Sequence, residues 1–151
     1  MREHRRVTRS LVVVLAVALV AGCRSKGAAC AQAVDQLDPI TQQIGKIAKD
    51  GEPRGATVGD PDNCARWGSF ADALETVLPQ LQDLHSNDAR LTELFQTYAE
   101  HVQGWVEAAR RVRDACSRSD VNATGAALQD DFHHGAQIPF VIADVNNYCH
   151  R

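Results

Sequence analysis

The sequence predicts an all-α protein, an up-down-up-down four-helix bundle with kinked second and fourth helices and two disulfides. Three observations favour this fold. No segment alternates apolar and polar residues over the length of a strand, so a sheet is not predicted. Four segments repeat apolar residues every seven positions, which gives each a stripe wide enough to face a core. All links except the first are short, as in antiparallel bundles.

The first helix is expected at residues 28–49. Its inward columns repeat every seven residues and consist of Cys30, Leu37 and Ile44, of Ala33, Ile40 and Ile47, and of Val34, Thr41 and Ala48. Acidic, glutamine and lysine side chains fall on the opposite face. The segment therefore has the amphipathic pattern of a helix that covers a core.

The second helix is expected at residues 64–84. Its inward columns include Trp67, Leu74 and Leu81, and Phe70, Val77 and Leu84. Asp60, Asp62 and Asn63 precede it and are typical of a helix start. Pro79 removes a backbone donor and crowds the preceding turn, which predicts a kink. Because the apolar pattern continues in phase, we expect one bent helix.

The third helix is expected at residues 88–117. It has the clearest stripe, with Leu91, Tyr98, Trp105 and Val112 in one column and Leu94, His101, Ala108 and Ala115 in the next. Four arginines, Arg110, Arg111, Arg113 and Arg118, lie at its C-terminal end. We interpret them as favourable charges near the negative end of the helix dipole rather than as an anion site.

The fourth helix is expected at residues 120–149. Its inward columns include Val121, Leu128, Gly135, Ile142 and Cys149, and Thr124, Asp131, Ile138 and Val145. Gly135 and Pro139 together predict a kink near its middle. A pair of short helices is the alternative.

The N-terminus has the pattern of a secretory signal peptide. Four arginines within the first nine residues precede an apolar run at residues 11–21, which is shorter than the ~20 residues of a membrane-spanning helix. The run ends in Val20-Ala21-Gly22-Cys23, which resembles the lipobox of bacterial lipoproteins. The resemblance covers residues 1–23 and implies that residues 1–22 are removed and that Cys23 carries lipid. Ordinary cleavage nearby, leaving Cys23 as a thiol, is the alternative.

The resemblance implies a lipid-anchored protein of the bacterial cell envelope. In a bacterium with two membranes, Arg24 stands where an aspartate would favour the inner membrane, so the outer membrane is implied. Residues 23–29 would form a short lipidated tether, at most about 20 Å long when extended. Residues 30–151 have the length of a single helical domain. The expected partners are the membrane, through the lipid, and an envelope protein or the wall.

The remaining cysteines predict two disulfides, since exported proteins fold in an oxidising compartment. With Cys23 assigned to lipid, four cysteines remain. The up-down order places Cys30 beside Cys149 at one end of the bundle and Cys64 beside Cys116 at the other, and we predict these pairs. Joining Cys30 to Cys64 would require spanning a helix of ~30 Å, against a Cα separation limit of about 7 Å.

Charge and motifs exclude several classes of function. Loss of residues 1–22 removes four arginines and one glutamate, which changes the formal net charge from −3 to −6 and disfavours nucleic-acid binding. Catalytic, phosphate-loop, haem and established metal motifs are absent from the sequence. We therefore expect no enzyme, no catalytic residues, and no cofactor apart from the lipid on Cys23.

One polar cluster remains unexplained. His101 and Asp131 both occupy inward positions near mid-height, and His134 lies beside the predicted kink. We interpret the cluster as a buried polar pair that fixes register, or as an outward Asp131 after a change of phase at the kink. A metal or ligand site formed by His101, Asp131 and His134 is one alternative, and acid-base chemistry is another.

The predicted function is that of a non-enzymatic binding or interaction module of the envelope. The alternative is a bundle that binds a metal or small ligand at the mid-bundle cluster. Residues 50–63 form a loop rich in glycine, proline and aspartate that is long enough to have its own role.

Overall fold

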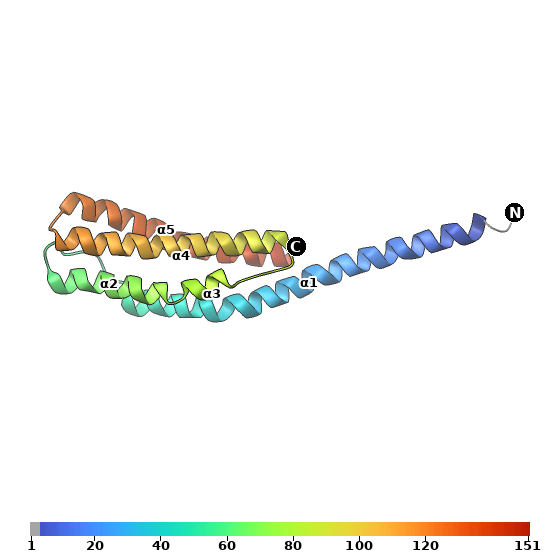
Figure 1. The fold of residues 1–151 in the computed structure, drawn as a ribbon, viewed down its shortest axis with the longest axis horizontal. Helices are drawn as coiled ribbons and strands as arrows, with labels where there is room; N and C mark the ends of the chain where they lie inside the picture. Colours follow the sequence, from blue (N-terminus) through green and yellow to red (C-terminus); the bar gives the residue numbers. More distant parts are fainter. Residues whose placement is uncertain (1–3) are drawn as a thin grey trace.

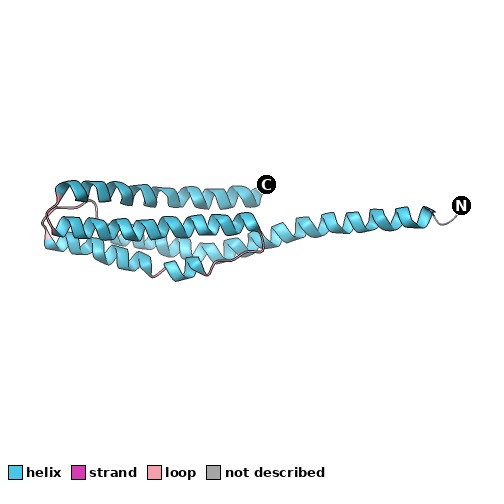
Figure 2. Cartoon of the chain, turned by 45° about the horizontal axis from the view of Figure 1, so that its top comes forward, coloured by secondary structure: helices cyan, strands magenta, loops and turns pink. Residues whose placement is uncertain are grey.

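The computed structural model describes the backbone of residues 4–151 and the side chains of residues 26–151. In this part of the chain all regular secondary structure is helical and there is no strand, which confirms the predicted all-α class (Figure 1). The helices are α1 (His4–Gly51), α2 (Pro61–Glu75), α3 (Leu78–Gln82), α4 (Ala89–Ser117) and α5 (Val121–His150). Helix α4 packs against α2, α3 and α5 and so lies at the centre of the bundle (Figure 2). Within the described residues, no helix is both long and apolar enough to cross a membrane.

Aspartates begin three of the helices. The side chain of Asp60 accepts hydrogen bonds from the backbone N–H groups of Asp62 and Asn63, at 3.0 and 3.2 Å. Asp88 and Asp120 cap α4 and α5 in the same way. Such side chains satisfy N–H groups that the first turn leaves without a partner, which stabilises a helix by about 1 kcal/mol.

The predicted single bent helix at residues 64–84 is wrong. Helix α2 ends at Glu75, and α3 starts at Leu78 with Pro79 in its first turn. Proline is well tolerated there because its missing N–H would have no helical partner. Inside a continuous helix, its ring would meet the carbonyl of Glu75, four residues earlier. The chain therefore breaks and starts a new helix.

The alternative of two short helices at the C-terminus is also wrong, because α5 is continuous from Val121 to His150. Gly135 lies inside this helix, and the indole of Trp105 on α4 packs directly against it. The glycine therefore allows the two helices to approach closely and does not mark a helix end.

Both predicted disulfides are confirmed. Cys30 is joined to Cys149 and Cys64 to Cys116, with Cα separations of 5.5 and 5.6 Å. The first lies where α1 meets the end of α5, and the second joins the first turn of α2 to the end of α4. The buried core between them is apolar, and Phe70 contacts Trp67 and Trp105 edge to face.

Residues 26–29, which we expected to be part of a tether, are helical and belong to α1. The ammonium of Lys26 lies 4.4 Å from the centre of the Tyr148 ring. The Tyr148 hydroxyl in turn donates a 2.7 Å hydrogen bond to Asp88. The chain is thus held to the bundle from Lys26 onward, whereas Cys23 lies outside the residues whose side chains are described.

Candidate functional site

The long loop after α1 is fastened to the bundle at several points. The N–H of Gly59 donates to the carbonyl of Cys116 at 3.1 Å, and the N–H of Thr57 donates to the Asn63 side chain at 2.8 Å. The indole N–H of Trp67 donates to the carbonyl of Gly55 at 3.3 Å. Gly55 and Gly59 have φ of 107° and 80°, which glycine adopts without strain. These bonds fix the loop against the buried Cys64–Cys116 disulfide.

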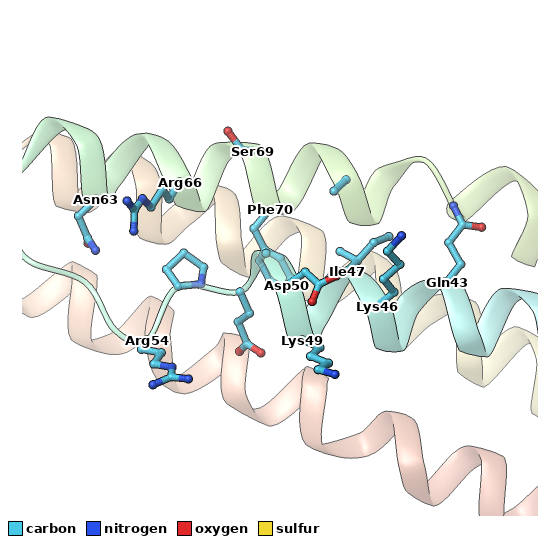
Figure 3. Close-up of a pocket in the computed structure, with 14 residues that line it drawn as sticks. Gln43, Lys46, Ile47, Lys49, Asp50, Arg54, Asn63, Arg66, Ser69 and Phe70 are labelled. Carbon is cyan, nitrogen blue, oxygen red and sulfur yellow. The ribbon is translucent and has the colours of Figure 1, made fainter.

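The fastened loop forms one wall of a cleft of about 1010 Å³ (Figure 3). The other walls are the last turns of α1 and the exposed side of α2. Its lining residues are Gln43, Lys46, Ile47, Lys49, Asp50, Gly51, Glu52, Pro53, Arg54, Asn63, Arg66, Ser69, Phe70 and Ala73. Ligand sites in proteins are concave and of roughly this size, and the lining of this cleft is mostly polar and charged. The cleft is therefore the strongest candidate for a binding site.

Most of the lysines and arginines that lack a partner within residues 26–151 line the cleft. Residues 26–151 contain eleven lysines and arginines. Five of them have a partner: Lys26 lies on an aromatic ring, and Arg90, Arg110, Arg111 and Arg113 form ion pairs. Four of the six without one line the cleft, namely Lys46, Lys49, Arg54 and Arg66. Only two carboxylates, Asp50 and Glu52, share that lining.

Asp131, on α5, is buried, and its Oδ1 has no hydrogen-bond partner among the described residues. The residue is 3% exposed. Burial, and next the negative charge of Glu52, raise the pKa of Asp131 to about 7. The indole N–H of Trp105 acts in the opposite direction by favouring the carboxylate, although its Nε1 lies outside hydrogen-bond geometry. Burial also raises the pKa of Glu52.

The predicted cluster of His101, Asp131 and His134 is only partly assembled. The rings of His101 and His134 lie 5.9 Å apart, and those of His133 and His134 5.5 Å apart. Burial, and then the neighbouring histidines, lower the pKa of His134. Within residues 26–151, Asp131 forms neither a hydrogen bond nor an ion pair with His101, and no three His, Cys, Asp or Glu side chains are placed to hold a metal.

The predicted polar pair between His101 and Asp131 is therefore not formed. Asp131 is inward, as its position in the repeat indicated, but it meets the Trp105 indole and the charge of Glu52. Thr41, at a similar level on α1, instead lies 3.4 Å from the hydroxyl of Tyr98. Positions in a repeat predict most of the inward side chains, although Val34 and Val121, which were expected to be inward, are 38% and 67% exposed. The partner across the core depends on the rotation of each helix.

The contact between Gly135 and Trp105 gives a testable prediction. A Cβ on Gly135 would lie 2.9 Å from Cζ2 and 3.0 Å from Cε2 of Trp105, which is buried and packs against Phe70. Gly135→Ala is therefore expected to lower the free energy of unfolding by about 1–2 kcal/mol, because overpacking outweighs the better helix propensity of alanine. Urea unfolding measures the change.

Gly125 provides the matched control on the same helix. No atom lies within 4 Å of a Cβ placed there. Gly125→Ala should therefore stabilise the protein by about 1 kcal/mol, through helix propensity alone. Equal effects at the two positions would contradict the close approach of Trp105.

The cleft was not predicted from the sequence, although the sequence shows the segments that form it. The sequence shows a long loop and nearby basic residues, but not that α1, the loop and α2 enclose one space. Comparison with known proteins adds no functional assignment, since no protein-family model, curated protein or solved structure matches the chain.

Proposed function

We propose that the protein is a lipid-anchored, non-enzymatic binding module of the bacterial cell envelope. The cleft between the end of α1, the fastened loop and α2 is the observation that supports binding, and its occupant would be an envelope component. The Val20-Ala21-Gly22-Cys23 motif supports the anchor, with lipid on Cys23 and, in a bacterium with two membranes, location in the outer membrane. The two disulfides are consistent with an exported protein.

The proposal includes an up-down-up-down order of the long helices. Three contacts support it. The Cys64–Cys116 disulfide joins the start of α2 to the end of α4, and the Cys30–Cys149 disulfide joins the middle of α1 to the end of α5. The hydrogen bond from Tyr148 to Asp88 likewise joins the end of α5 to the start of α4. In such an order, the cleft lies at the end of the bundle opposite Cys30 and faces away from the anchor.

Photo-crosslinking in the native envelope tests the binding role. A photoreactive side chain at Ser69, which is exposed and lines the cleft, is expected to give a light-dependent adduct with an envelope component. The same group at Gln129, exposed on α5 and outside the cleft, serves as the control. Excess protein without the photoreactive group should suppress the adduct, since it competes for the same component.

Two results would count against the proposal, and each concerns a different part. Equal labelling from positions 69 and 129 would show that the cleft is not the binding site. Cell fractionation and mass spectrometry of the N-terminal peptide test the anchor separately. Wild-type protein should be found with membranes and carry acyl chains, whereas Cys23→Ser should not.

A further inference from the structure

From the charges of the cleft, we infer that its ligand is an oligoanion, a molecule with two or more phosphate or carboxylate groups. This inference rests on the proposed binding role and adds the chemical class of the ligand. Three properties of the cleft favour such a ligand: its unpaired cations, its fixed wall and its size.

The cations of the cleft lack the partners that most cations elsewhere in the bundle have. Arg110 lies 2.6 Å from Glu75 and 3.4 Å from Asp72, and Arg111 lies 3.0 Å from Asp130. In contrast, neither Lys46 nor Arg66 forms an ion pair within residues 26–151. Four unpaired cations in one cleft of an acidic chain produce a local positive potential, which attracts anions.

Nearby carboxylates offset part of this potential without cancelling it. The carboxylate of Asp60, at the start of α2, already accepts hydrogen bonds from two backbone N–H groups as the helix cap. Asp50 and Glu52 belong to the lining, but four cations exceed two carboxylates. An anionic ligand would therefore supply the charge that the cleft lacks.

The arrangement of the cations suits a ligand held between two walls. Figure 3 shows Arg66 extending from α2 toward the loop and Lys46 extending from α1 toward α2, with Lys49 and Arg54 at the opposite rim. The bonds from Trp67 to Gly55 and from Thr57 to Asn63 hold the loop that carries Arg54. A wall that is already fixed loses little conformational entropy on binding, which favours affinity.

The size of the cleft favours a multivalent anion over a single small ion. At about 1010 Å³, it is far larger than one phosphate or carboxylate group requires. The half-buried side chains of Ile47 and Ala73 provide a small apolar surface between the charges, which suits the uncharged part of an extended ligand. The guanidinium groups of Arg54 and Arg66 can bind either phosphate or carboxylate through two parallel hydrogen bonds.

Calorimetric titration of the full-length lipid-anchored protein in detergent tests the inference. Three probes are used: tripolyphosphate, citrate, and maltotriose as an uncharged comparison. We expect at least one of the two anions to bind and maltotriose not to bind. Affinity should fall when salt is raised from about 0.02 M to about 0.2 M, because partly exposed charges are screened. The anion that binds more tightly identifies phosphate or carboxylate as the source of the charge.

Paired variants locate the site. Lys46→Gln with Arg66→Gln should weaken binding of the preferred anion about tenfold, since each partly exposed ion pair contributes roughly a factor of three. Arg118→Gln with Arg151→Gln removes the same charge from two cations outside the cleft and should change affinity less than about twofold. Circular dichroism and thermal unfolding show whether each variant stays folded.

The outcomes separate this inference from the proposed function. If neither anion binds while the Ser69 adduct still forms, the oligoanion is wrong and the binding role stands. Equal weakening by the two pairs of variants would overturn the cleft as the anion site. If the Ser69 adduct also fails, both proposals are overturned.

Discussion

Removal of the Cys30–Cys149 disulfide, by Cys30→Ala with Cys149→Ala, is expected to lower the free energy of unfolding by about 5 kcal/mol. The bridge joins residues 119 positions apart, so it excludes most extended conformations of the unfolded chain. In the chain-entropy account, this loss grows with the logarithm of loop length. Urea unfolding gives both the free energy and the m-value, which should rise because the unfolded chain becomes less compact.

Two comparisons make this result interpretable. Val34→Ala, on the same helix and only partly buried, should cost less than about 1 kcal/mol because it removes a small, half-exposed side chain. Cys64→Ala with Cys116→Ala opens a shorter loop of 52 positions and should cost about 4 kcal/mol from chain entropy. If loss of the longer bridge costs no more than Val34→Ala, the bridge does not brace the fold.

Asp131→Asn is expected to stabilise the protein above neutral pH by an amount on the order of 4 kcal/mol. In the folded protein the pKa of Asp131 is about 7, so the carboxyl group stays protonated up to roughly neutral pH. In the unfolded chain its pKa has the ordinary value of 3.8, so the proton is released at a much lower pH. Between these values the folded state binds more protons, so stability falls as the pH rises through this interval. Asparagine has a similar shape but does not ionise, so the variant lacks this loss.

Urea unfolding of wild type and variant at several values between about pH 4 and pH 8.5 measures the difference. The two proteins should be almost equally stable at the acidic end and diverge as the pH rises. Both carry His134, whose lowered pKa favours folding as the pH rises toward the ordinary histidine value. Subtracting the two profiles removes that contribution and isolates Asp131.

Asp130→Asn is the matched control. Asp130 is the preceding residue, exposed and paired with Arg111 at 3.0 Å. Loss of this ion pair should lower the free energy of unfolding by less than about 1 kcal/mol, as for other surface ion pairs. Parallel pH profiles for wild type and Asp131→Asn would mean that Asp131 is hydrated in the folded protein.

The amino-acid sequence alone determined the helical class and the disulfide pairs. Seven-residue apolar repeats indicate which face of each helix is buried, and the expected up-down order of the helices placed the cysteines at matching ends. Asp60 and Asp88 identify helix starts through local hydrogen bonds, which depend on neighbouring residues only. The sequence also provides the lipobox resemblance at Cys23, which remains a prediction.

Tertiary structure decided the features that depend on contacts between helices. Gly135 and Pro139 together predicted a kink, but Gly135 provides space for Trp105, whose position depends on the packing of α4 against α5. His101 and Asp131 share a level in the pattern, yet helix rotation directs Asp131 toward Trp105 and Glu52. The cleft likewise exists only where the loop is fastened to Cys116 and α2. Local periodicity specifies burial, whereas contacts between distant residues require the orientation of every helix, which no single segment encodes.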